Sequence, residues 1–167
     1  MATTYKAIAT VTVGSGGAAN IEFTSIPGTY TDLVLKLSLR CSTTQDAGYI
    51  YLNGNSSNYT MRDLQGDGAN AYSGSRSDNY MTAQMVPSGD TASTFNNSEF
   101  YFPNYAGSTN KSFSSDSVNE NNGTYAQSRL RAHLWSDTSA VTSIKIAPYT
   151  GNYAQYSTAT LYGIKNS

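Results

Sequence analysis

The residues best suited to chemistry in this chain lie in the segment RLRAHLW, which ends at Trp135. His133 is the only histidine among the 167 residues, and imidazole is the side chain that most readily exchanges a proton near neutral pH. Side chains alternate between the two faces of a strand. This alternation puts four of them on one face, which we expect to be the outer one: Arg129, Arg131, His133 and Trp135. The opposite face, which we expect to point inward, carries Leu130, Ala132 and Leu134.

Two interpretations of this charged face remain open. Two guanidinium groups, an imidazole and an indole could together bind a sugar, a peptide or an acidic partner. The alternative is an ordinary strand face that only contacts solvent. A catalytic role for His133 is disfavoured because the chain has no Gly-X-Ser-X-Gly turn to present a nucleophile. We therefore predict no catalytic residue, and no enzymatic activity.

Carboxylates and metal ligands could support a different chemistry. Glycoside hydrolysis needs two carboxyl groups that face each other, and nothing in the pattern pairs Glu22, Glu99 and Glu120. Calcium prefers carboxylate and carbonyl oxygens, and a glycine-rich segment is flanked by Asp63, Asp67 and Asp78. Their spacing does not follow the known calcium-loop pattern, and one Cys with one His makes no transition-metal cluster. The sequence thus predicts neither a metal nor a cofactor.

The composition favours contacts made by uncharged groups. The chain has 14 Tyr and 14 Gly, only 13% charged residues and a formal net charge of -1. A clustered basic face is the usual mark of nucleic-acid binding, so such a partner is not expected. Tyr-rich polar surfaces suit adaptable binding, although Tyr and Thr are also simply common in strands. The candidates for stacking on a host glycan are the tyrosines expected near loops, Tyr72, Tyr80, Tyr149, Tyr153 and Tyr156.

The elements that must position these residues are strands, as the segment from Ile21 to Arg40 shows most clearly. After a turn at Pro27-Gly28, one face of its second half carries Leu33, Leu35, Leu37 and Leu39. The opposite face is largely polar. Apolar residues at every second position predict a half-buried strand that covers a hydrophobic core.

The remaining chain continues as strand after strand, without a helical pattern. Asn53-Gly54 predicts a hairpin that joins 48–53 to 59–64, and the polar segment 65–79 is expected to be a long loop. Roughly ten strands in one domain, residues 1–167, predict an all-β, two-sheet antiparallel sandwich of jelly-roll-like form. No apolar run is long enough to span a membrane, and the N-terminus lacks the apolar core of a signal peptide.

Four segments together resemble a known family of proteins. They are IEFTSIPGTYTDLVLKLSLR from Ile21, Asn53-Gly54 followed by YTMRDLQGDG, FYFPNYAGSTNKSF from Phe100, and the terminal STATLYGIKNS. The combination resembles a β-rich domain of virion structural proteins in tailed bacteriophages, cyanophages above all. The resemblance covers residues 21–167 and lies in strands and turns, so it carries over no catalytic residue.

The resemblance implies a protein made in the host cytoplasm and displayed on the virion surface. A short chain without a coiled-coil or collagen-like shaft fits a capsid decoration (cement) protein better than a fibre. The implied partners are the major capsid protein or other virion proteins, with the chain itself a homotrimer or homodimer. The alternative is a tail-fibre or receptor-binding tip that recognises host glycan. An enzyme that degrades polysaccharide is a more distant third.

Overall fold

The computed structural model describes residues 4–122 and 126–165, in which twelve strands form two antiparallel sheets packed face to face. The larger sheet has eight strands, in the order β1 (Tyr5–Thr12), β12 (Thr158–Ile164), β3 (Asp32–Ser38), β8 (Asn97–Pro103), β9 (Lys111–Asn119), β10 (Gln127–Trp135), β5 (Tyr59–Gly66) and β6 (Ala71–Asp78). The smaller sheet has the order β2 (Ile21–Phe23), β11 (Ile144–Pro148), β4 (Ala47–Leu52) and β7 (Met81–Gln84). The predicted all-β sandwich is confirmed. No helix within the described ranges is long and apolar enough to cross a membrane.

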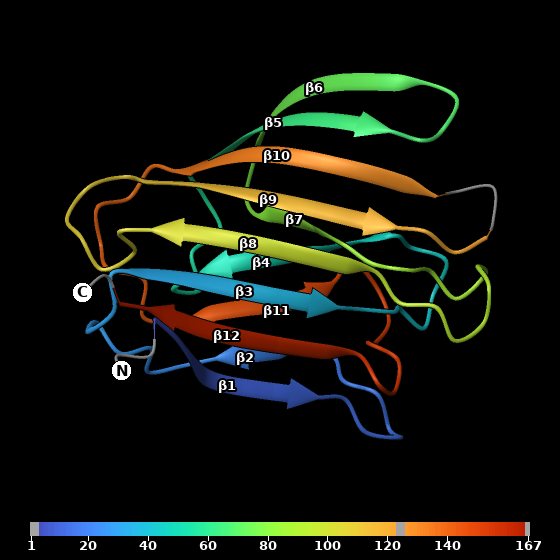
Figure 1. The fold of residues 1–167 in the computed structure, drawn as a ribbon, viewed down its shortest axis with the longest axis horizontal. Helices are drawn as coiled ribbons and strands as arrows, with labels where there is room; N and C mark the ends of the chain where they lie inside the picture. Colours follow the sequence, from blue (N-terminus) through green and yellow to red (C-terminus); the bar gives the residue numbers. More distant parts are fainter. Residues whose placement is uncertain (1–3, 123–125, 166–167) are drawn as a thin grey trace.

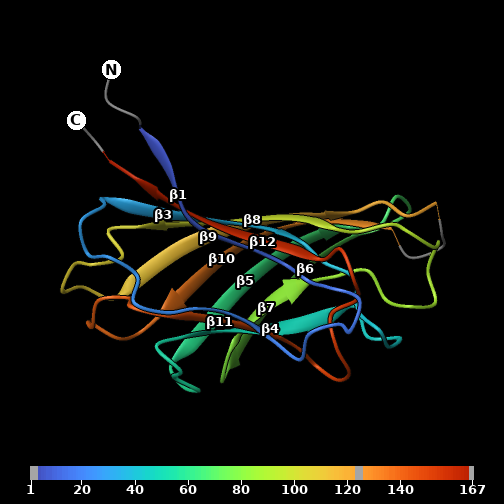
Figure 2. The ribbon, with the colours of Figure 1, turned by 90° about the horizontal axis from the view of Figure 1, so that it is seen from below.

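The core lies between the two sheets, and β3 runs through the middle of it. Leu33, Leu35 and Leu37 are at most 2% exposed, so the predicted leucine face is indeed buried. Opposite them, the smaller sheet contributes apolar side chains from three of its strands, Ile21, Phe23, Ile50, Leu52, Ile144 and Ile146. The other face of β3 lies outside this core cluster, and Asp32 and Val34 on that face are buried as well. Figure 2 shows the two layers, with β3, β8 and β12 in the upper one and β4, β7 and β11 in the lower one.

Strands from the two ends of the chain pair with each other, β1 with β12 and β2 with β11. This nesting requires the chain to cross between the sheets, and one crossing occurs at Asn53-Gly54. Both residues have positive φ, 52° and 68°, as a tight turn of this type demands. The predicted hairpin across it is wrong, because β4 pairs with β11 and β7 whereas β5 pairs with β10 and β6. The Asn53 side chain instead anchors the turn to the segment before β11, donating to the Ala140 carbonyl (2.8 Å) and accepting from the Thr142 amide (2.8 Å).

The segment 65–79 is a β-hairpin and not the loop that its composition suggests. Its turn is closed by Asp67, whose carboxylate accepts hydrogen bonds from the amides of Ala69 (2.9 Å) and Asn70 (2.6 Å). The second strand, β6, is exposed along nearly its whole length. Figure 1 shows the cause, since β5 and β6 extend beyond β7, the edge of the smaller sheet. A strand with neither face covered has no apolar alternation by which sequence could reveal it.

Candidate interaction surfaces

The predicted outer face of β10 is in fact its inner face. Arg131 and His133 are each 2% exposed and Trp135 is 1% exposed, whereas Leu130 is 57% exposed. The prediction that Leu130, Ala132 and Leu134 point inward is therefore wrong. Trp135 determines which face of β10 is buried, because its large ring packs in the core on Tyr59, with the ring centroids 6.1 Å apart. Burying Trp135 turns every second residue before it inward as well.

Arg131 belongs to a buried polar layer between the sheets. Its Nε lies 3.0 Å from Oδ1 of Asp63, and its terminal nitrogens approach the Thr82 carbonyl and Gln84 Oε1, both at 3.4 Å. Burial, with a contribution from neighbouring Arg129, lowers the pKa of Arg131 to about 10 in spite of Asp63. Arg129 lies at the margin of the same layer and donates to Gln127 (3.0 Å). Arg131 thus links the larger sheet to β7 of the smaller sheet, and it is out of reach of a partner.

His133 is enclosed by aromatic rings. It stacks on Phe113 with centroids 5.0 Å apart and an interplanar angle of 8°, and Phe100 lies at 5.9 Å. Its Nε2 is 2.9 Å from the Ser115 hydroxyl. Burial, followed by repulsion from Arg131, lowers the pKa of His133 to about 3, so the ring is neutral at physiological pH. Since Ser115 is itself only 3% exposed, this Ser–His pair has no access to a substrate.

The predicted tyrosines separate into three groups. Tyr153 is 0% exposed, so its assignment as a surface contact is wrong; its backbone is paired with Ala18 and its ring is part of the core. Tyr72 (50% exposed) and Tyr156 (67%) are surface residues on β6 and just before β12, respectively. The remaining two, Tyr80 and Tyr149, come together on the outer face of the smaller sheet.

Tyr80 and Tyr149 form a cluster with two tyrosines of β4 that the sequence analysis missed, Tyr49 and Tyr51. The centroid of the Tyr49 ring is 3.9 Å from that of Tyr80, 5.5 Å from that of Tyr149 and 6.1 Å from that of Tyr51. We call these four residues the tyrosine cluster. Alternation in GYIYL, with Ile50 and Leu52 inward, was the available signal for the two that were missed.

The tyrosine cluster is uncharged, and its chemistry is that of rings and hydroxyls. Burial first, and then the hydrogen bond with Tyr80, raises the pKa of Tyr49 well above its usual value. Burial likewise raises the pKa of Tyr51. Lys145 lies directly opposite Tyr51 in the sheet and Glu22 opposite Lys145, so charge is confined to the border. The cluster can pack against a protein or stack on a sugar ring, with the hydroxyls available for hydrogen bonds.

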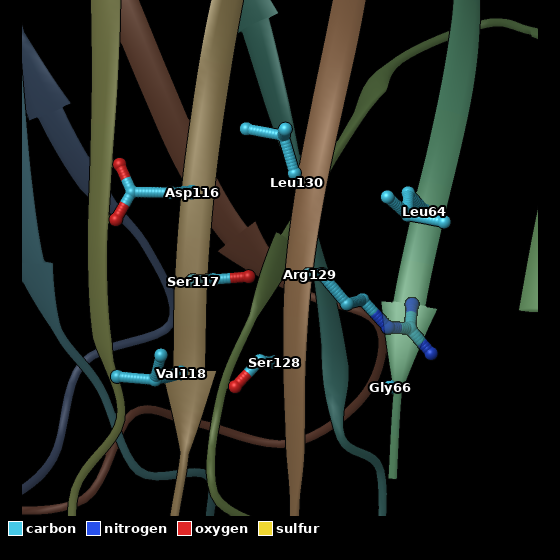
Figure 3. Close-up of a pocket in the computed structure, with 8 residues that line it drawn as sticks. All are labelled: Leu64, Gly66, Asp116, Ser117, Val118, Ser128, Arg129 and Leu130. Atoms are coloured by element: carbon cyan, nitrogen blue, oxygen red, sulfur yellow. The ribbon is translucent and has the colours of Figure 1, made fainter. Parts of the chain in front are cut away.

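A second surface, on the far side of the sandwich, is apolar. On the outer face of β5, β9 and β10, Leu64 is 55%, Leu130 57% and Val118 43% exposed. Leu64 and Leu130 are directly opposite each other in the sheet, and we call this pair the leucine ridge (Figure 3). An open hollow of about 310 Å³ lies on the Gly66 and Val118 side of the ridge. A second, of about 330 Å³, lies on the Arg62 and Ala132 side.

The three aspartates that flank the glycine-rich segment all bind protein groups instead of converging. Asp63 pairs with Arg131, Asp67 closes the β5–β6 turn, and Asp78 lies 3.4 Å from Arg76. Within residues 4–122 and 126–165, no group of three or more His, Cys, Asp or Glu side chains is placed to hold a metal ion.

No protein-family model matches the chain, and no curated protein matches it in sequence. A functional proposal therefore depends on the two surfaces just described, together with the resemblance of the strand and turn segments.

Proposed function

We propose that this chain is a non-enzymatic structural protein of a tailed-bacteriophage virion, a decoration (cement) protein that binds and stabilises the capsid shell. The observation that carries the proposal is the tyrosine cluster, an aromatic, uncharged surface on the outside of a rigid sheet. The sequence resemblance to virion structural proteins supports the same assignment. In this role the protein is made in the host cytoplasm and lies on the surface of the particle.

The mechanism is one of repeated contact. Tyr side chains provide a large contact area at a low cost in conformational entropy, because each has only two rotatable bonds. In the tyrosine cluster the cost is lower still, since the rings already pack on one another at centroid distances of 3.9–6.4 Å. The partner is the major capsid protein or a neighbouring virion protein. Many copies, each bound modestly, together hold the shell subunits in place.

The test is binding to shells that lack the protein. Purified protein is added to particles of the parent phage from which this gene has been deleted, and occupancy is measured by cryo-electron microscopy. We expect hundreds of copies on the shell, and a loss of occupancy of about 10-fold or more for Tyr149→Ala, the most exposed member of the cluster. Tyr156→Ala is the matched control, because Tyr156 is even more exposed but lies outside the cluster.

Two results would overturn the proposal. One is a shell that binds Tyr149→Ala as well as it binds the unaltered protein. The other is a handful of copies confined to the tail, which favours the alternative function, a tail-fibre or receptor-binding tip that recognises host glycan. The tyrosine cluster supports that alternative too, since the apolar face of a sugar ring packs on an aromatic ring. Strong binding on a glycan array that Tyr149→Ala abolishes would establish it.

A further inference from the structure

On β10, charged and polar side chains are buried on the inner face, whereas a leucine is exposed on the outer face. Its inner face buries the cation of Arg131 and the imidazole of His133, and its outer face exposes Leu130. Burying a charge is costly, and leaving a leucine in water forgoes about 1.5–3 kcal/mol of apolar burial. Two other outward positions in the sheet carry charged side chains, Lys36 on β3 and Glu99 on β8. A surface that covers Leu130 would recover the stabilisation that the monomer forgoes.

Two of the exposed apolar side chains on this face are directly opposite each other in the sheet, and the third is diagonal to one of them. Leu130 is in register with Leu64 on β5, and Val118 is opposite Ser128, two residues before Leu130 on β10. Single exposed apolar residues are normal on a protein surface, whereas a contiguous patch marks a site of association.

The patch combines the leucine ridge with two shallow hollows. The leucine ridge stands between two hollows of nearly equal size, about 310 and 330 Å³. Small residues next to the ridge create the hollows, Gly66, Ser114, Ser128 and Ala132. When two such faces meet, the ridge of one can enter a hollow of the other, and the reverse contact forms at the same time.

The charges at the border are complementary in the same sense. Arg62, on β5, borders one hollow, and Asp116, on β9, borders the other. Among the described residues neither takes part in an ion pair. A partner of one charge sign would meet an opposite charge on one border and a like charge on the other. When a two-fold axis lies midway between Arg62 and Asp116, Arg62 of each copy faces Asp116 of the other, so a second copy meets opposite charges on both borders.

We propose that the outer face of β5, β9 and β10 is the interface of a face-to-face homodimer, in which each leucine ridge packs beside the other and Arg62 of each copy pairs with Asp116 of its partner. The small net charge of -1 opposes such self-association very little. The inference goes beyond the proposed function and does not depend on it, because it concerns the purified chain alone.

The first test is the mass of the protein in solution. Sedimentation equilibrium between about 1 and 300 µM should show a monomer–dimer equilibrium, and Leu130→Asp should weaken it at least about 100-fold. Because Leu130 is 57% exposed, the variant is expected to fold, which its circular dichroism checks. Thr10→Asp places the same new charge on the outer face of β1, away from the patch, and should leave the equilibrium unchanged.

The second test is an exchange of charges, which a merely structural role could not reproduce. Arg62→Asp and Asp116→Arg should each be monomeric, because each homodimer would then contain two like-charge pairs. An equimolar mixture of the two variants should form a heterodimer, since both of its pairs are opposite in charge. The double variant should dimerise again for the same reason.

Three outcomes overturn the inference. The unaltered protein stays monomeric at the highest concentration, or it forms a trimer, or the mixture of the two charge variants fails to associate. None of these outcomes bears on shell binding through the tyrosine cluster, so the two proposals fail separately.

Discussion

The buried imidazole of His133 gives this protein a dependence on pH that can be worked out in advance. The pKa of His133 is lowered from 6.5 to about 3, chiefly by burial and then by Arg131. Between these two values the unfolded chain binds a proton that the native protein does not. The free energy of unfolding therefore rises with pH across this window, and stability is lost as the pH falls from 6.5 towards 3.

The size of the effect follows from the two pKa values. Between about pH 7.5 and pH 5, the native protein should lose about 2 kcal/mol of its free energy of unfolding through this one group. His133 is the one histidine of the chain, and the pKa values of Asp67 and Asp137 are lowered, away from this interval.

Urea denaturation at fixed protein and salt concentrations measures this loss. The control is the double variant His133→Phe, Ser115→Ala, which keeps an aromatic ring against Phe113 and removes both partners of the buried hydrogen bond. Its free energy of unfolding should change by less than about 0.5 kcal/mol over the same interval. A flat profile for the unaltered protein, or an equally steep one for the double variant, would refute the reasoning.

Three further predictions concern stability and are also measured by urea denaturation. Asp63→Asn should cost about 3 kcal/mol, because it leaves Arg131, whose side chain is 1% exposed, as a buried cation without its carboxylate. Arg131→Met should cost clearly less, because the side chain of Asp63 that it leaves unpaired is 21% exposed. Equal costs would contradict this. Gly163→Ala should cost about 1–3 kcal/mol, because the added Cβ would collide with the ring of Tyr30. Its cost should shrink in a Tyr30→Ala background, and simple additivity would exclude the collision. Leu35→Ala should cost about 2–5 kcal/mol, since Leu35 is 0% exposed on the central strand, and a cost below about 1 kcal/mol would mean that the core relaxes freely around it.

The sandwich itself could be predicted because the sequence of some strands shows clearly which of their two faces is buried. On β3, leucines at every second position leave one face for the core, and the structure agrees. The turn at Asn53-Gly54 was equally predictable, because Asn and Gly tolerate the positive φ that both residues adopt. What local sequence could not supply is which strand pairs with which. The hydrogen bonds of Asn53 to residues 140 and 142 are contacts across nearly ninety residues.

The site residues were less predictable, because on β10 both faces look plausible as the buried one. One face has leucines and an alanine, and the other has Trp135 among charged residues. The number of apolar residues favours burial of the first face. The second face is the buried one, because the large indole of Trp135 stacks on Tyr59 in the core. Partners for Arg131 come from β5 and β7, which a single strand pattern does not contain. Leu130 was assigned to the core for the same reason, although it is 57% exposed.

The two proposals together constrain how the protein would sit on a particle. The leucine ridge and the tyrosine cluster lie on opposite faces of the sandwich, since one is on the outside of the larger sheet and the other on the outside of the smaller sheet. In a face-to-face dimer joined through the ridge, the two tyrosine clusters must point in opposite directions. Only one of them can contact a given shell surface.

A dimer on the shell should therefore appear in cryo-electron microscopy as two stacked sandwiches, an inner copy docked through its tyrosine cluster and an outer copy held by the ridge. Leu130→Asp should remove the outer copy and leave the inner one, because it disrupts the dimer and not the docking surface. Tyr149→Ala should remove both layers. Loss of both layers in Leu130→Asp would mean that the same face serves dimerisation and docking, and the division of roles between the two surfaces would have to be abandoned.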